Sequence, residues 1–268
     1  VKLYTVYRSD LDIDRLQLSL DEIAAWSVTW QLPISVQKCS ILKLGTKTPA
    51  CGFYLLHTRL QESKSVKDLG IIIDDQLKLI THINSIVAKA QSRANFIFKC
   101  FVSRDLNTLL RAFIVYVRPL LEYASPVWNP HHKYAVAKIE SVQRRFTKRL
   151  PGMFNEDYKT RLIKLNLPSL ERRRLIYDLV TLYKILFDLC ESSLKSSLVL
   201  KSTENISTRG NPLRLHFQTH SNDIGKYSFV SRVANVWNCQ PSSVVNFSSV
   251  NCFKRTVKNA ELNLFTDF

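Results

Sequence analysis

The sequence lacks the short motifs that mark most catalytic and metal sites. It has six glycines in 268 residues, and no GxSxG, P-loop, HExxH or GxGxxG motif occurs in it, which leaves little for a loop that cradles phosphate. Its six cysteines are scattered without a CxxC pair, so neither a structural zinc site nor a disulfide framework is expected. We expect reduced thiols and no metal bound by this chain.

Long apolar runs and a secretion signal are missing as well. The best apolar candidate, Leu106 to Leu121, is interrupted by Arg111 and Arg118, so no transmembrane helix is predicted. No signal-peptide pattern opens the sequence, and we expect a cytoplasmic and nuclear protein. The single methionine is Met153. Because the chain does not begin with methionine, we expect a piece of a longer protein.

Positive charge is what the sequence has in excess. Lysine and arginine number 38 against 22 acidic residues, which gives a formal charge of +16 and a pI near 9.7. Such an excess repels itself in the folded state, so a polyanionic partner is expected, either nucleic acid or an anionic membrane. A basic protein with no such partner is the alternative.

The first quarter of the chain predicts a mixed α and β segment. Valine, tyrosine and threonine near the start favour a strand, and apolar residues then recur at helical spacing. The predicted order is a strand over Val1–Tyr7, a helix capped by Ser9 or Asp10 that ends near Trp30, a strand over Cys39–Leu44, and strands over Phe53–His57 and Lys67–Ile73 that pair with each other.

The pattern then changes to the helical period. We expect an α+β fold in three parts, residues 1–77, 78–190 and 191–268. The predicted helices cover Ile83–Phe101, Leu106–Tyr123 with a kink or end at Pro119, Tyr134–Leu150, Ser169–Leu189, Tyr227–Trp237 and Val250–Leu262, and Ser192–Asn211 is predicted to be a loop.

The helix predicted over Tyr134–Leu150 separates apolar from basic residues. At 3.6 residues per turn its two sides are distinct, and the acid within the basic side is Glu140. One-sided positive charge suits a phosphate backbone, while a solvated surface is the equal alternative. The apolar side holds Val136, Ile139, Val142, Phe146 and Leu150, and the basic side holds Lys138, Arg144, Arg145, Lys148 and Arg149.

Arg172, Arg173 and Arg174 form a second basic cluster at the start of the next predicted helix. Positive charge near a helix N-terminus opposes the helix dipole and gains little structurally. This argument favours a binding role for the cluster over a structural one.

Two further constellations have structural alternatives that we prefer. Asp74-Asp75 follows an apolar strand and could bind magnesium, but two-metal chemistry needs more carboxylates, and a turn or cap role fits better. The aromatic cluster beside Pro126 and Pro130 could stack on bases, but large aromatics more often fill cores. The cluster comprises Tyr123, Trp128, His131, His132 and Tyr134.

Several long phrases, in order and over essentially the whole chain, resemble the reverse transcriptases of non-LTR (LINE-type, jockey-like) retrotransposons. They are VKLYTV with LDEIAAWSVTWQLPISVQKCSILKLG, SVKDLGIIID, LLRAFIVYVRPLLEYASPVWNP, KIESVQRRFTKRLPG, LNLPSLERRRLIYDLVTLYKIL, RVANVWN and CFKRTVKN.

The resemblance implies the C-terminal part of such an enzyme: a partial polymerase palm followed by a helical thumb and tail. Lys38 resembles the lysine of palm motif D, which lies near the phosphates of the incoming nucleotide. Asp68 to Ile71, with Leu69 and Gly70 at its centre, resembles motif E, the primer grip. The helices from Leu79 to Leu150 resemble the thumb that holds the primer–template duplex, which adds Lys89 and Arg93 to the expected nucleic-acid-binding residues.

The same resemblance implies the partners. They are an RNA template and a DNA primer, with a deoxynucleotide and Mg²⁺ in the parent enzyme. The catalytic carboxylates of that family would lie just before Val1, so this chain alone is expected to bind nucleic acid without polymerase activity or a cofactor. The alternative is a degenerate or domesticated relic that binds proteins or nothing. A membrane-surface role ranks third, because the predicted apolar faces suit a core.

Overall fold

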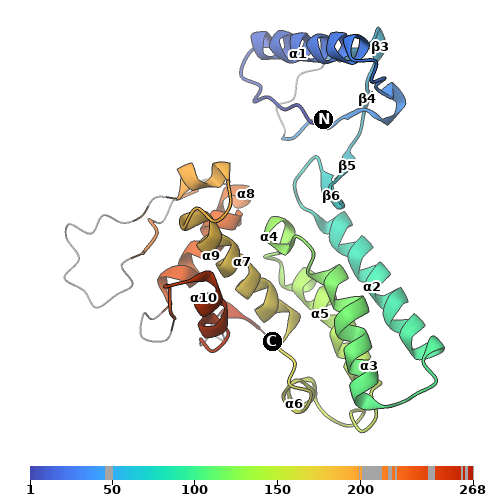
Figure 1. Cartoon of the computed structure of the whole chain (residues 1–268), viewed down its shortest axis with the longest axis vertical. Coiled ribbons are helices and arrows are strands. Elements are labelled where there is room, and N and C mark those ends of the chain that lie inside the picture. The colour runs from blue at the N-terminus through green and yellow to red at the C-terminus, as the bar shows by residue number, and fades with distance from the viewer. Residues whose placement is uncertain are drawn as a thin grey trace, which may run out of the picture. The chain divides into compact units, whose positions relative to one another are not determined.

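Helices make up most of the chain, and small two-stranded sheets lie in its first part (Figure 1). This computed structural model has the expected α+β composition and separates into two units, Val1–His82 and Ile83–Phe268. The structure describes residues 1–45, 51–198, 200, 213–216, 219–220, 222–240, 245–260, 262 and 265–267.

The first unit is built around helix α1 (Asp10–Thr29). Its start is fixed by Ser9, as predicted, whose backbone N–H donates to the carboxylate of Asp12 at 2.9 Å. The helix lays its apolar side on a small core of Phe53, Leu55 and Leu60. The predicted amphipathic helix and its end near Trp30 are therefore confirmed.

Three two-stranded sheets complete this unit in the described residues. Strand β1 (Ser40–Ile41) pairs in parallel with β4 (Gln61–Glu62), and the other two pairs are antiparallel. These are β2 (Tyr54–Leu55) with β3 (Thr58–Arg59), and β5 (Ser65–Asp68) with β6 (Ile71–Asp74).

Two strand predictions are wrong. Val1–Tyr7 is not a strand: all of its residues are exposed, and no described strand pairs with its backbone. Phe53–His57 does not pair with Lys67–Ile73 either, because each region closes its own hairpin. Both hairpins turn over two residues with positive φ, a geometry that matches the twist of adjacent strands. The turn residues are Leu56 and His57 in one hairpin and Leu69 and Gly70 in the other.

The second unit begins along helix α2 (Ile80–Cys100). Helix α3 (Leu106–Ala112) follows and continues as a π-helical turn, Phe113–Val117, and a 3₁₀ turn, Arg118–Leu121. Pro119 has no N–H for an α-helical ladder, so the change of helix type at this point confirms the predicted kink or end.

The remaining helices pack around two apolar clusters. Phe146 joins one cluster, with ring centroids 4.8 Å from Phe98 and 4.6 Å from Phe113, and Trp237 and Phe253 lie in the other. The helices are α4 (Ser125–Trp128), α5 (Lys133–Lys148), α6 (Tyr158–Lys164), α7 (Leu170–Leu186), α8 (Asp223–Lys226), α9 (Phe229–Asn238) and α10 (Val250–Val257).

Helices α4, α6 and α8 were not predicted, since each is too short to show a period. The predicted loop over Ser192–Asn211 contains a 3₁₀ turn at Ser193–Ser197, and its residues 199 and 201–211 lie outside the described residues. Among the helices that the structure describes, none has the length and apolar character to cross a bilayer.

Candidate nucleic-acid interface

Helix α5 buries one side and exposes a row of basic residues beside it. Val136, Ile139, Val142, Phe146 and Leu150 are all at most 7% exposed, which confirms the predicted apolar side. Lys138, Arg145 and Arg149 lie within about 40° of one another around the axis, at about 100° per residue. The basic row therefore follows the helix lengthwise along one edge of its buried side.

This row runs beside helix α2. Lys138 donates to the side-chain oxygen of Asn84 at 2.5 Å, and Arg149 Nη1 donates to that of Asn95 at 2.7 Å. The partners in each pair are 54 residues apart in the sequence. The second contact therefore lies the same number of residues further along α2 as along α5, in the same direction. Helices α2 and α5 are thus parallel neighbours joined at two points, about three turns apart.

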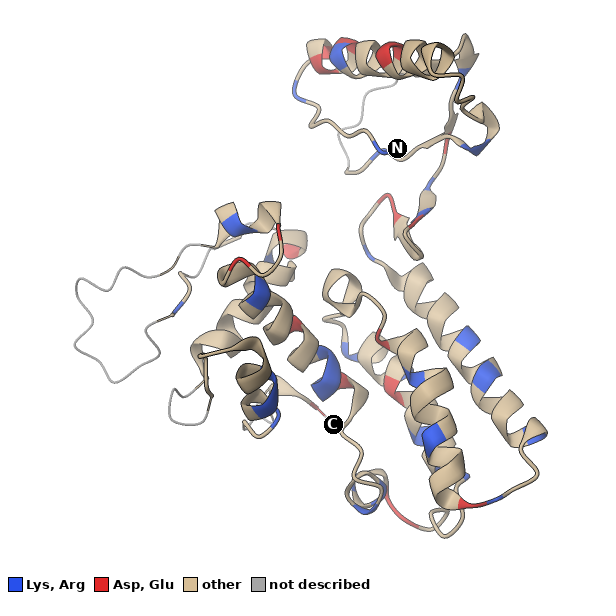
Figure 2. Cartoon of the chain, in the orientation of Figure 1, with Lys and Arg blue, Asp and Glu red and all other residues tan. Residues whose placement is uncertain are grey.

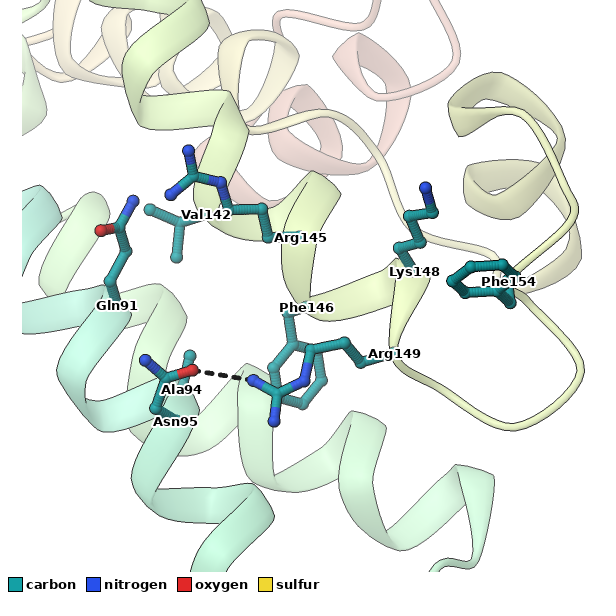
Figure 3. A pocket seen from close by; sticks show the side chains of 9 residues that line it. All are labelled: Gln91, Ala94, Asn95, Val142, Arg145, Phe146, Lys148, Arg149 and Phe154. Carbon is teal, nitrogen blue, oxygen red and sulfur yellow. Dashed lines mark hydrogen bonds between the residues drawn. The ribbon is translucent and has the colours of Figure 1, made fainter.

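A hollow of about 450 Å³ is lined by α2, α5 and the turn after α5, at the end where Arg149 meets Asn95, and we name it the α2/α5 groove. Figure 3 shows cationic side chains from α5 and its C-terminal end facing amides from α2 across it. None of the described residues that line it is acidic. They are Gln91, Ala94, Asn95, Val142, Arg145, Phe146, Lys148, Arg149 and Phe154.

The exposed charged side chains on the two helices that form the groove are positive. Helix α2 contains Lys89, Arg93 and Lys99 and no acidic residue (Figure 2). The acid in α5, Glu140, is completely buried. Within the described part of the chain, no carboxylate forms an ion pair with Lys138, Arg145, Lys148 or Arg149.

Neutral groups hold these cations in place. The Arg149 guanidinium lies 4.0 Å above the ring centroid of Phe98, in addition to its bond with Asn95. The Lys148 ammonium lies 4.9 Å from the ring centroid of Phe154. Amides and aromatic faces orient a cation without cancelling its charge, so the groove keeps its full positive charge for an anionic ligand.

Other basic residues expected to bind lie elsewhere. Lys89 and Arg93 are exposed, but they point about 140° and 180° around α2 from Asn84. Arg144 is half-buried on α5, with its guanidinium 5.0 Å from the ring centroid of Tyr158. The structure therefore brings together Lys138, Arg145, Lys148 and Arg149 and separates the other three.

The cluster at the start of α7 makes intramolecular contacts. Arg172 donates to the backbone carbonyls of Lys258 and Ala260, both at 3.0 Å. Arg173 forms an ion pair with Glu122. Arg174 is completely buried. The expectation that these charges gain little structurally is wrong. Carbonyls hold Arg172, a carboxylate holds Arg173, and the side-chain amide of Asn129 accepts from Arg174.

Glu140 explains how α7 starts in a buried, basic setting. Its carboxylate accepts from the backbone N–H groups of Leu170 and Glu171, each at 3.2 Å, and from the Tyr158 hydroxyl. The helix dipole stabilises a negatively charged carboxylate at the helix N-terminus. Burial, together with the negative charge of Glu140, raises the pKa of Tyr158.

Lys38, Leu69 and Gly70 belong to the first unit. Lys38 is exposed at the end of a 3₁₀ turn, Val36–Lys38, immediately before β1. Leu69 is 85% exposed, and Leu69 and Gly70 form the turn of the β5–β6 hairpin.

Asp74 ends β6 and holds the turn that leads to α2. Its carboxylate accepts from the backbone N–H groups of Gln76, Lys78 and Leu79 at 3.1, 2.9 and 2.9 Å. The preferred interpretation of Asp74-Asp75 as a turn or cap is therefore confirmed, with Asp74 as the turn residue. No group of three or more candidate metal ligands occurs among the described residues.

The aromatic cluster is divided between core and surface. Trp128 is 1% exposed, and its ring N–H donates to the carbonyl of Tyr123 at 2.8 Å, as the core reading predicts. Tyr123 and Tyr134 are about 60% exposed, so the prediction that the cluster fills the core is wrong for these two residues. His131 stacks on Tyr227 at 3.7 Å, and partial burial lowers the pKa of its imidazole.

The residues that sequence reasoning missed are the amides opposite the basic row and Phe154. A signal for the amides was present: Asn84, Gln91 and Asn95 have the spacing of Lys138, Arg145 and Arg149, seven residues and then four. Matching spacing on two helices allows two rows to face each other. Phe154 lies in a turn after α5 that no periodicity marks.

Comparison with known proteins gives little further guidance. No protein-family model matches the chain, and no solved structure matches it. An uncharacterised protein from Caenorhabditis elegans is 28% identical over 124 residues, which is 45% of this chain. The matched region spans 63% of the length of that protein.

Proposed function

We propose that the chain binds the phosphate backbone of a nucleic acid in the α2/α5 groove. The observation that carries this proposal is that three cations, Arg145, Lys148 and Arg149, line the groove without an acidic partner in the described residues. Lys138 continues the same row along α5 toward Asn84. Each phosphate contact by such a cation releases counterions, which favours binding regardless of sequence.

The resemblance to non-LTR reverse transcriptases supplies the larger role. Under this proposal the helices around the groove act as the thumb, and the bound nucleic acid is the primer–template duplex of RNA and DNA. The first unit is the end of the palm, with Lys38 near the nucleotide phosphates and the Leu69-Gly70 turn at the primer. Deoxynucleotide and Mg²⁺ would be bound by the parent enzyme with carboxylates that this chain does not supply.

Titration with an RNA/DNA hybrid duplex over a salt series tests the backbone contact. We expect the binding constant to fall steeply between about 50 and 200 mM salt. The double variant Arg145→Gln/Lys148→Gln removes two groove charges and should flatten the slope of log K against log salt by up to about 2. These two side chains carry little of the packing, since both are exposed.

A matched control is available on α2. Lys89→Gln/Arg93→Gln removes the same charge from exposed positions outside the groove, and it should change the slope by less than half as much. An equal change in both variants would mean that binding is spread over the surface. A flat salt response of the wild type would reject nucleic-acid binding and favour the protein-binding relic.

A further inference from the structure

The turn between α5 and α6 presents an exposed aromatic ring at the end of the groove. Phe154 is 68% exposed and lines the groove together with Lys148 and Arg149. In Figure 3 its ring lies beside Lys148 at one edge of the groove. Exposing a large aromatic ring to water is unfavourable, so the exposure of Phe154 next to unneutralised cations suggests that the ring contacts a ligand.

The exposure of Phe154 does not come from a loose loop. Arg161, 3% exposed, donates to the carbonyl of Glu156 at 2.9 Å and to that of Arg144 at 3.2 Å, which ties the turn back to α5. Asp157 caps α6 by accepting from the N–H of Lys159 at 3.0 Å. The backbone that carries the ring is therefore fixed before any ligand arrives, which lowers the entropy cost of binding.

The acids nearest in sequence to Phe154 are engaged elsewhere. Glu156 pairs with Lys164 at 2.6 Å, and Asp157 serves as the cap of α6. The turn is thus an aromatic ring next to cations whose charge is not cancelled. That combination suits nucleic acid with an unpaired base, since the cations contact phosphate while the ring stacks on the base.

We infer that Phe154 stacks on an unpaired base of the nucleic acid whose backbone occupies the α2/α5 groove. The groove then distinguishes a duplex with a single-stranded overhang from a blunt one. This inference rests on the proposed function, because the backbone contact brings the base to the ring. It adds a preference that cations alone do not give, since phosphate contacts carry no information about base pairing.

Two labelled RNA/DNA hybrids, identical except for a short overhang, test the inference with the whole chain. The wild type should bind the overhang hybrid more tightly than the blunt one. Phe154→Ala should weaken overhang binding roughly tenfold, as expected for loss of one base–aromatic stack, and should change blunt binding less than twofold. Phe154→Trp should keep the preference, and its added fluorescence should be quenched by the overhang hybrid and not by the blunt one.

Phe96→Ala is the matched control, because Phe96 is 63% exposed on α2 and does not line the groove. Circular dichroism checks that each variant is folded. Unchanged overhang binding by Phe154→Ala, or equal losses with both hybrids or both variants, would overturn the inference and leave backbone binding intact. Loss of self-association in Phe154→Ala without any change in overhang binding would overturn it in favour of a protein contact. Absence of binding by the wild type would reject the proposed function and the inference together.

Discussion

Arg232 on α9 forms a two-pronged ion pair with Asp178 on α7. Its Nε donates to Oδ2 at 3.1 Å and its Nη2 donates to Oδ1 at 3.2 Å, and the Asp178 carboxylate is completely buried. The amide of Asn129 also donates to this carboxylate, at 2.8 Å, while its oxygen accepts from Arg174 at 3.0 Å. This network joins α9, α7 and the turn after α4.

We expect Asp178→Ala to lower the free energy of unfolding by about 3–5 kcal/mol, because it leaves the partly buried Arg232 without its counter-charge and breaks a buried hydrogen-bond network. Urea unfolding followed by circular dichroism measures this. The control is Asp188→Ala, which breaks an exposed pair with Lys195 and should cost less than about 1 kcal/mol. Equal losses in the two variants would mean that the network does not hold α9 in place.

Tyr158 predicts a loss of stability at high pH. Burial and Glu140 raise the pKa of its hydroxyl in the folded protein. The unfolded chain therefore releases this proton from about pH 10 upward while the folded protein keeps it, and stability falls by up to about 1.4 kcal/mol per pH unit. Unfolding measured at pH 9 and pH 11 should show a smaller decline for Tyr158→Phe. Parallel declines would contradict the buried hydroxyl.

Asp74 and Asp75 should differ sharply in their effect on stability. Asp74→Ala removes the acceptor of three backbone hydrogen bonds and should lower the free energy of unfolding by about 1–2 kcal/mol. Asp75→Ala should change it by less than about 0.5 kcal/mol. Thermal unfolding with and without Mg²⁺ distinguishes the roles, since a shared metal site would make both variants lose a magnesium-dependent shift.

Leu69 has a backbone conformation that suits another residue. Its φ is +45°, and the following Gly70 has φ of +91°. Asparagine is favoured at the first position of such a turn, so Leu69→Asn should raise the free energy of unfolding by about 0.5–1 kcal/mol. Thermal unfolding measures the gain. A loss of stability would show that the exposed leucine packs against the unit after all.

The same variant also addresses the primer-grip proposal. If Leu69 contacts nucleic acid, Leu69→Asn should weaken hybrid binding while it stabilises the protein. Stability and binding would then change in opposite directions, a common result at functional positions. Unchanged binding would remove Leu69 from the proposed interface.

Periodicity was sufficient where an element is long and buries one side. The helix predicted over Tyr134–Leu150 and the five apolar residues of its buried side were found because every third or fourth residue is apolar. The burial of Glu140, which was placed on the basic side, was not predicted. The short hairpins were paired wrongly, since strands of two or four residues carry too little alternation and the turns at Leu56 and Leu69 lack the usual Asn-Gly signal.

The site was only partly predictable for a different reason. The charge and the helical periodicity of the sequence located the basic side of α5. The sequence of one helix does not specify which other helix packs beside it. The facing amides of α2 emerged once tertiary packing placed Asn84 and Asn95 opposite Lys138 and Arg149. At Arg172 and Arg173, composition could not reveal partners, because those partners lie far away in the sequence.

The amides that orient Lys138 and Arg149 do not cancel their positive charges, so both folding stability and nucleic-acid affinity should depend on ionic strength. Unneutralised cations along α2 and α5 repel one another, and added salt screens that repulsion. The same salt weakens attraction to phosphate. Folding stability and nucleic-acid affinity should thus have opposite salt dependences, so that the protein is most dependent on its ligand for stability in dilute buffer.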